Sequence, residues 1–439
     1  MNRRVASFAL SIVVVSTAAR AQEPVGRTTG ASPYLDAVGG LTLESAITRA
    51  LEREPSLRAA RTQIDVAQGA RTQAELRPNP SVSFSQLQEP GGTDAQTRIE
   101  LQWPLDLYRK SARVAVADRE IDAAHQATAN QERTLAAEVR TKYGEVLTAI
   151  RTLSVTEELL LATTRQRGLI ASRVEQGAAP PLDRDMLRVE EQKLEADRRL
   201  QMGMVERRLV ELKRLLGMAA DATLTLRQPL EELVRETVAT PAPQDAQAIT
   251  ARADVLEAEA RIHLAEAQID RAHREGRPDV SVFGMYMRMD AGFPQQGFSP
   301  SGTLERVRDV FHYWSAGAMV TLPIASRNQG NVAAAEAERT GAAAQLEATR
   351  LTAQAEIAAA RSRDEHARQA LQAYSGDAIR LATQNLDVIR QTYELGRGTL
   401  FDVLNEQRRY FEIEQSFTDV LSEAYAARQA LKTALGEIR

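Results

Sequence analysis

The hydrophobic residues of this chain follow two spacings in turn, one typical of helices and one typical of strands. From Leu41 to Leu57 the apolar side chains recur every three or four residues, which indicates one buried helix face. Thr42 stands at the start of this run and is a candidate N-cap. We expect a helix that begins there and ends before Pro78, because proline is poorly tolerated inside a helix.

Two short runs after this helix alternate polar and apolar residues, a pattern typical of half-buried strands. The first run is Ser81–Ser85 and the second is Arg98–Trp103, and the turn-forming stretch Glu89–Asp94 separates them. The pattern predicts a β-hairpin with strands at about 81–87 and 97–103.

A long helical stretch follows the hairpin. Residues 105–176 contain no proline and two glycines, and at about 1.5 Å per residue they would form a rod of roughly 105 Å. Residues 177–181, with one glycine, two alanines and two prolines, interrupt the pattern, and a second helix is expected from Leu182 to about Leu216. The two rods should form an antiparallel hairpin with its tip at 177–181.

The same order of motifs returns in the second half of the chain. The matching pairs are Arg77-Pro78 with Arg277-Pro278, at an offset of 200, and Pro104 with Pro323, Gly177 with Gly396 and Asp183 with Asp402, at an offset of 219. We therefore predict a tandem duplication, with repeats at 41–240 and 241–439. The 219 − 200 = 19 extra residues should lie in one loop at about 290–312.

The second repeat then contains strands at about 280–289 and 313–322, a rod at 325–395, a helical hairpin tip at about 396–400 and a last helix. Its first strand has an uncertain register. Met285, Met287 and Met289 share one face, whereas the offset of 200 places Val282 on the other, and a bulge would reconcile the two. The methionines could form a site for a soft metal, but lipid-facing strand residues are the favoured interpretation.

One face of the first predicted hairpin is apolar and the other is polar. The apolar side chains are Val82, Phe84, Ile99, Leu101 and Trp103, and we expect them to face lipid. Trp103 and Trp314 are the only tryptophans, and they fall at opposite predicted strand ends, where the aromatic girdles of membrane barrels lie. The alternative is that both tryptophans belong to an ordinary core.

Four strands are too few to close a transmembrane barrel, whose smallest examples have about eight. Open sheet edges are not tolerated in lipid, so several chains must combine, and two or three of them would suffice. The fold class predicted is mainly α with a small transmembrane β-barrel, built from duplicated long α-hairpins and two β-hairpins per chain. The long helices would extend into the periplasm, because their faces carry too many charges to lie in the membrane.

The N-terminus indicates export. Arg3 and Arg4 precede an apolar run that is too short to span a bilayer, and Ala19-Arg20-Ala21 resembles a signal peptidase site. We expect a signal peptide at 1–21, cleaved after Ala21, followed by an extended arm at 22–40, and the alternative is an uncleaved anchor. The chain of 439 residues has no cysteine, so neither disulfides nor a lipid anchor is expected.

The remaining composition excludes several functions. A net charge of −4 gives no indication of nucleic acid binding, and no serine–histidine–aspartate set or phosphate loop indicates an enzyme. The histidines are scattered without ligand spacing, so we expect no metal site and no cofactor.

Several short motifs resemble those of the TolC-type outer-membrane efflux proteins over nearly the whole mature chain. They are Leu41-Thr42-Leu43-Glu44-Ser45-Ala46, Glu54-Pro55-Ser56-Leu57, Arg77-Pro78-Asn79-Pro80, Trp103-Pro104-Leu105-Asp106, Leu322-Pro323-Ile324, Tyr393-Glu394-Leu395-Gly396 and Thr399-Leu400-Phe401-Asp402-Val403-Leu404. The resemblance implies a homotrimeric α/β barrel in outer-membrane lipid, continued by a periplasmic helical tunnel. An inner-membrane transporter and a periplasmic adaptor protein are the implied partners.

The resemblance also implies an entrance at the tunnel tip. Tyr393 and Asp402 match a tyrosine and an aspartate that hold or line this aperture in the TolC protein. Asn405 stands at a second aspartate position, and Arg397 lies one residue before the position of an arginine. Asp402 could line a three-fold ring, cap the following helix, or do both.

Two further expectations concern the helical hairpin tips and the cargo. Gly177 and Gly396 should adopt positive φ at the two tips and contribute to the adaptor-contacting surface. Ser326-Arg327-Asn328-Gln329-Gly330 is similar to the divalent-metal efflux branch of the family. The function predicted is a passive exit duct of a tripartite efflux system, and the alternative is a periplasmic adaptor subunit of such a pump.

Overall fold

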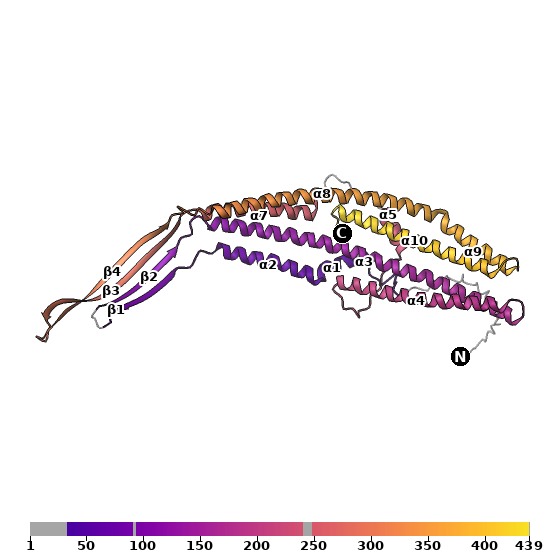
Figure 1. Ribbon diagram of the computed structural model, residues 1–439, viewed down its shortest axis with the longest axis horizontal. Helices are drawn as coiled ribbons and strands as arrows, with labels where there is room; N and C mark the ends of the chain where they lie inside the picture. The colour runs from indigo at the N-terminus through magenta and orange to yellow at the C-terminus, as the bar shows by residue number, and fades with distance from the viewer. Residues whose placement is uncertain (1–32, 91–93, 240–247, 439) are drawn as a thin grey trace, which may run out of the picture.

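The computed structural model describes residues 33–90, 94–239 and 248–438, which form an elongated, curved molecule with helices along most of its length and one sheet at an end (Figure 1). The predicted signal peptide, 1–21, lies outside the described residues, as does most of the predicted arm. The chain is mainly helical with a small antiparallel sheet, as predicted.

The first predicted helix is present but divided. It consists of α1 (Leu43–Arg53) and α2 (Pro55–Glu75), and the side chain of Thr42 caps α1 by accepting a hydrogen bond from the Ser45 N–H. Glu54 ends α1 and also caps α2, because its carboxylate accepts a hydrogen bond from the Leu57 N–H at 2.8 Å. Proline at the first position of α2 needs no hydrogen-bond acceptor, which explains why the break lies at this point.

The four strands form one antiparallel sheet in chain order. They are β1 (Ser81–Gln88), β2 (Ala95–Pro104), β3 (Asp279–Phe298) and β4 (Leu304–Thr321). The second hairpin is longer than predicted, and the prediction of a loop at about 290–312 is wrong. Most of that segment continues β3 and β4 as a paired ribbon, and the turn between them is confined to 299–303.

The pairing of β3 with β2 shows which residues of the third strand share a face. Val282 pairs with Trp103 and Met285 pairs with Glu100, in a ladder without a bulge from Ala95 to Pro104. Cross-strand partners share a face, so Val282 lies on the apolar face with Trp103, as the offset of 200 required. The methionines therefore lie on the opposite face, and the interpretation of them as lipid-facing is wrong.

The long helices form two antiparallel hairpins. The first is α3 (Lys110–Glu175) with α4 (Pro181–Leu215), and the second is α8 (Gln329–Ala373), η1 (Tyr374–Ala378) and α9 (Ile379–Glu394) with α10 (Leu400–Ala434). The predicted rod at 325–395 is thus interrupted by the π-helical turn η1. The shorter helices are α5 (Leu230–Ala239), α6 (Ala248–Ala251) and α7 (Ala253–Glu275). None of the helices in the described ranges has a stretch long and apolar enough to cross a membrane.

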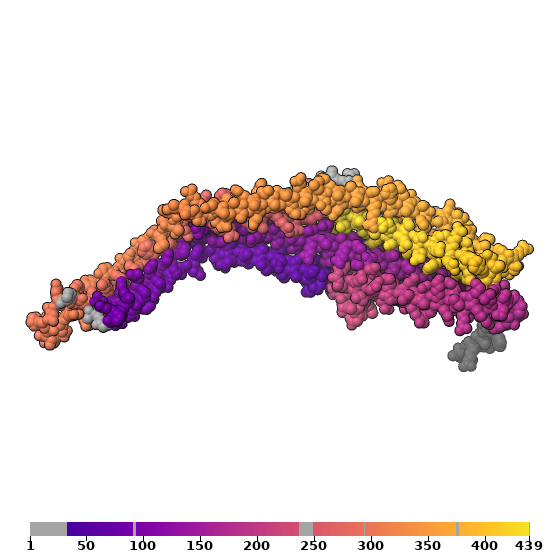
Figure 2. Space-filling view, viewed as in Figure 1, coloured from indigo at the N-terminus to yellow at the C-terminus, as the bar shows by residue number. Residues whose placement is uncertain are grey.

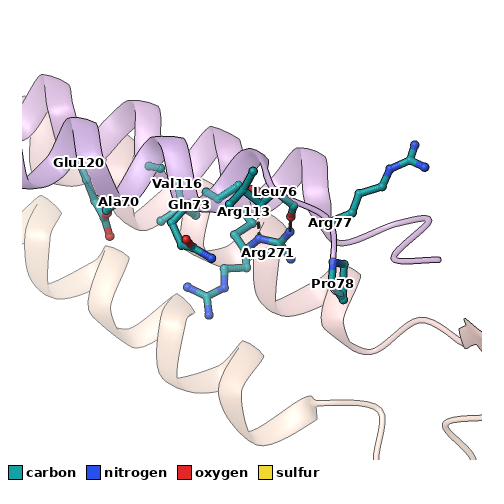
Figure 3. A pocket seen from close by; sticks show the side chains of 11 residues that line it. Ala70, Gln73, Leu76, Arg77, Pro78, Arg113, Val116, Glu120 and Arg271 are labelled. Carbon is teal, nitrogen blue, oxygen red and sulfur yellow. Dashed lines mark hydrogen bonds between the residues drawn. The ribbon is translucent and has the colours of Figure 1, made fainter. Parts of the chain in front are cut away.

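Two sharp corners connect the sheet to the long helices. Asp106 and Asn328, with φ of 47° and 63°, are the non-glycine residues of the described chain with left-handed backbone, and each lies at such a corner. Arg113 donates to the carbonyls of Ala74 and Leu76 at the end of α2, as Figure 3 shows, and pairs with the carboxylate of Asp106 at 2.9 Å. These contacts use carbonyls that a helix end leaves without partners, and so fix the angle between helix and sheet.

The main core lies midway along the helices, where α1, α3, α4, α5 and α10 meet. Tyr143 and Tyr425 are both buried there, and the hydroxyl of Tyr425 donates to the carbonyl of Arg140 at 3.0 Å. The aromatic ring of Tyr425 lies against Gly144, where a Cβ atom would be only 2.3 Å from its Cε1 atom. Gly144 is therefore the residue that lets α10 approach α3 closely.

Candidate functional site

The tips of the two helical hairpins lie at the same end of the molecule, opposite the sheet (Figures 1 and 2). A small apolar cluster joins them: Ile170 of α3, Leu187 of α4, and Leu400 and Val403 of α10 are all buried in it. Tyr393 of α9 packs against the same cluster. The two tips therefore form one packed unit within the chain.

Each tip begins with a glycine in the left-handed conformation. Gly177 has φ of 72° and Gly396 has φ of 71°, which confirms the positive φ expected at both positions. Around Gly396, its own N–H donates to the Tyr393 carbonyl and the next N–H donates to the Thr392 carbonyl. The same pair of bonds forms around Gly177, and this is the Schellman arrangement that ends helices.

Tyr393 links the two hairpins through its hydroxyl, which donates to Oδ2 of Asp183 in α4 at 3.0 Å. Burial, and then the neighbouring Asp183 carboxylate, raise the pKa of Tyr393 to about 12, so the hydroxyl remains a donor at neutral pH. Asp183 was not among the predicted site residues. Its signal in the sequence was its offset of 219 from Asp402, because the two aspartates occupy matching positions after the two tips.

Asp402 caps its own helix. Its carboxylate accepts from the Thr399 N–H at 3.0 Å, while the Thr399 hydroxyl accepts from the Asp402 N–H at 3.2 Å, which completes a capping box. Hydrogen bonds from the Thr399 side chain and backbone lower the pKa of this carboxyl group. Capping by Asp402 is confirmed, and its lining of a pore stays a prediction.

The remaining predicted aperture residues are exposed. Arg397 lies in the turn, where its N–H donates to the Thr392 carbonyl, and Asn405 lies on the first turns of α10. Tyr393 bonds to Asp183, whereas Asp402 bonds to Thr399. Within one chain, these two predicted aperture residues therefore do not belong to one hydrogen-bond network.

The tryptophans lie on the apolar face of the sheet at two levels. Trp314, which is 80% exposed, is in contact with Tyr286, with ring centroids 4.7 Å apart. Because β4 is longer than predicted, Trp314 lies within the strand and not at its end. Trp103 lies near the helices, and its Nε1–H donates to the Pro78 carbonyl at 3.1 Å.

Trp314 nevertheless marks a boundary on this face. At the next level of the ladder, the residues on this face are Thr97 of β2, Arg288 of β3 and His312 of β4, which are polar. From Trp314 to the exposed Leu322 is eight residues, or about 27 Å along the strand at about 3.4 Å per residue. A strand tilt of about 40° reduces this to about 21 Å, close to the apolar band of about 25 Å on membrane barrels.

Within the described ranges no group of three or more histidine, cysteine, aspartate or glutamate side chains is arranged to hold a metal ion. The sheet and the paired tips are therefore the features of this chain that bear on function.

Comparisons with known proteins place these features in a family. A model described as outer membrane efflux protein matches residues 46–218 and 246–437. The cobalt-zinc-cadmium resistance protein CzcC of Cupriavidus metallidurans is 24% identical over 402 residues, which cover 91% of each chain. The outer membrane protein OprJ of Pseudomonas aeruginosa is 27% identical over 424 residues, covering 90% of this chain and 84% of OprJ.

Solved structures have the same fold. CusC superposes with a TM-score of 0.73 at 21% identity, covering 90% of this chain and 92% of CusC. VceC of Vibrio cholerae superposes with a TM-score of 0.70 at 20% identity, covering 90% of this chain and 96% of VceC. Since the family model spans most of both halves of the sequence, the chain belongs to the outer membrane efflux protein family.

Proposed function

We propose that three copies of this outer-membrane efflux protein assemble into one duct, which crosses the outer membrane and extends through the periplasm. The observation that carries this proposal is the sheet. Within the part of the chain described, β1 and β4 each pair along one edge only, so the sheet remains open on both sides. Open edges are not tolerated in lipid, and four strands cannot close by themselves.

Three chains would supply twelve strands and two would supply eight. The family resemblance favours three. The apolar face, with Trp103 and Trp314 near its two ends, would then contact outer-membrane lipid, and the opposite face would line the lumen. The helical hairpins would continue the barrel as a periplasmic tunnel through which the cargo passes without chemical change.

The tips would form the closed entrance. The bond from Tyr393 to Asp183 ties α9 to α4, and its loss would let the second helical hairpin move away from the first. Asp402, with Asn405 one turn further along α10, would converge on the three-fold axis, and three carboxylates there would attract cations. Arg397 is exposed in the turn and would be available to a neighbouring subunit.

The tips also offer a docking surface for a periplasmic adaptor. Leu182 and Phe401, which are related by the offset of 219, are 66% and 62% exposed directly after the two turns. Gly177 and Gly396 keep the turns narrow, so these side chains stand at the end of the molecule. Exposed apolar residues in equivalent places on both tips suit a repeated contact with adaptor subunits.

The proposed cargo is metal cations, delivered by an inner-membrane transporter. Support comes from the relative that is named as a cobalt-zinc-cadmium resistance protein and that matches this chain along 91% of its length. The alternative function, a periplasmic adaptor subunit, is not supported, because the family model that matches is that of the outer-membrane channels.

Export would use the predicted signal peptide, with cleavage after Ala21 and no lipid anchor. Mass spectrometry of the protein from outer membranes should give Gln22 as an unmodified or cyclised N-terminus. An intact Ala21, or a mass that includes acyl chains, would refute this part of the proposal.

The channel function is tested by reconstitution. The detergent-purified protein should insert into planar bilayers and give discrete conductance steps, whereas an adaptor would give none. A strain that lacks the chain should become sensitive to metal salts before it becomes sensitive to drugs, and the reverse order would overturn the proposed cargo while leaving the channel intact.

A further inference from the structure

Three methionines lie on the face of the sheet that is opposite to the apolar face. Met285, Met287 and Met289 alternate along β3, so their side chains project on the same side. Their cross-strand partners on β2 are Glu100, Arg98 and Gln96 respectively. The register therefore places a row of thioethers beside polar and charged groups of β2.

On β4 the same face carries Ser315, Tyr313 and Phe311, which pair with Met285, Met287 and Met289 in that order. On β1 the same face carries Ser81, Ser83 and Ser85, and on β2 it continues with Gln102. The chain has nine methionines, and three of them form this one row. The three side chains are half-buried, which leaves part of each accessible from the polar side of the sheet.

The spacing of the row suits a shared ligand. Residues two apart on a strand are about 6.8 Å apart, and the three rotatable bonds of methionine allow neighbouring sulfurs to converge. The side-chain amide of Gln96 donates to the sulfur of Met287, so this sulfur lies at the sheet surface, where an incoming cation would replace the amide as its partner. Glu100 and Arg98 carry opposite charges, so the flanking strand adds no net charge that would repel a cation.

Thioether sulfur is a soft, uncharged ligand that selects Cu(I) and similar ions over harder divalent metals. We propose that Met285, Met287 and Met289 form a binding site for a soft monovalent cation, Cu(I) or Ag(I), on the inner wall of the barrel. The position of the site in the lumen rests on the proposed channel function, whereas the binding of the ion rests on the register alone. The site would give exported soft cations a weak resting place near the outer exit.

Methionine methyl resonances report on this site directly. We would label the full-length mature protein with 13C-methyl methionine, assign the signals by single Met→Leu variants, and titrate it with Ag+ in nitrate buffer. The expected result is a saturable shift of the signals of Met285, Met287 and Met289 together. Zn2+ added at the same concentration should leave all three signals in place.

The variant M285L/M287L/M289L should lose the saturable Ag+ binding, while M186L/M202L/M204L, with three matched changes on α4, should retain it. Both should keep the bilayer conductance of the wild type, which tests the channel function separately. Two results would overturn the site: no shift of the three signals with Ag+, or unchanged Ag+ affinity in the β3 variant. Either would mean that the methionines serve only to pack on this face, with Met287 and Met289 beside Tyr313 and Phe311, their partners on β4.

Discussion

Replacing Tyr393 by phenylalanine should make the closed entrance less stable without disturbing the fold of the tip. The change removes one hydroxyl, and with it the 3.0 Å hydrogen bond to Asp183, and leaves the ring in its apolar cluster. A hydrogen bond to a charged acceptor contributes about 1.5–3 kcal/mol, and partial exposure of this tyrosine favours the lower end.

The size of the effect follows from that free energy. About 1.4 kcal/mol changes an equilibrium about tenfold, so the ratio of open to closed states should rise about tenfold if one subunit opens alone. If three subunits open together, the contributions add and the ratio should rise up to about a thousandfold. Asp183→Asn keeps a neutral acceptor for the tyrosine, so its effect on the free energy should be about half as large.

Open probability in planar bilayers measures this ratio. Tyr410→Phe is the matched control, because the Tyr410 hydroxyl donates to Glu414 within α10 and does not join the two helical hairpins. The expected order of open probability is Y393F, then D183N, then the wild type with Y410F. Equal open probability in Y393F and the wild type, or an equal rise in Y410F, would refute the role of this bond.

The same bond predicts a dependence on alkaline pH. The pKa of Tyr393 is raised from its ordinary value of 10.0 to about 12 where it packs in the tip and bonds to Asp183, so the stabilisation is fully present below pH 10. It is lost as the pH rises through about 12, because the deprotonated oxygen can no longer donate. Open probability of the wild type should therefore rise between pH 10 and pH 12, and Y393F should lack this step.

Further changes test the helical core, the proposed entrance and the part of the second hairpin at 293–307. Gly144→Ala should lower the free energy of unfolding by about 1–3 kcal/mol, measured by thermal unfolding, because the new Cβ would lie against the Tyr425 ring. The control is Gly168→Ala, whose Cβ would meet nothing within 4 Å and which should be neutral or stabilising by up to about 1 kcal/mol. Asp402→Lys should reduce cation selectivity in bilayers, and unchanged selectivity would remove this residue from the pore lining. Replacing residues 293–307 by Asn-Gly should leave oligomer assembly intact, because β2 pairs with β3 only as far as Asp290, and loss of the oligomer would show that the ribbon is structural.

The helices and the first hairpin could be predicted because each depends on local spacing and local breakers. Thr42, Pro78 and the two tip glycines act on their own segments, and the structure has an element boundary at or near each of them. The break at Glu54 was missed, although Pro55 signalled it, because the apolar spacing continues across both helices.

Two features could not be predicted in the same way: the length of the second hairpin, and the side of the sheet on which Met285, Met287 and Met289 lie. The residues of 290–312 alternate poorly, and they form strands because β3 and β4 pair with each other along most of their length, with one register shift between Gly292 and Gln296. The face of a strand depends on register, which is set by the neighbouring strand and not by its own sequence. The hydrogen bond from Tyr393 to Asp183 could not be predicted either, since the two residues lie 210 positions apart and the offset of 219 marked Asp183 only as the counterpart of Asp402.

In the proposed assembly, one chain supplies only part of the barrel wall and three chains complete it. Light scattering of the mature protein, purified in detergent and corrected for bound detergent, measures the number of chains in the particle. We expect a particle of three chains that loses solubility when the detergent is removed. A folded single chain that remains soluble in detergent-free buffer would contradict it.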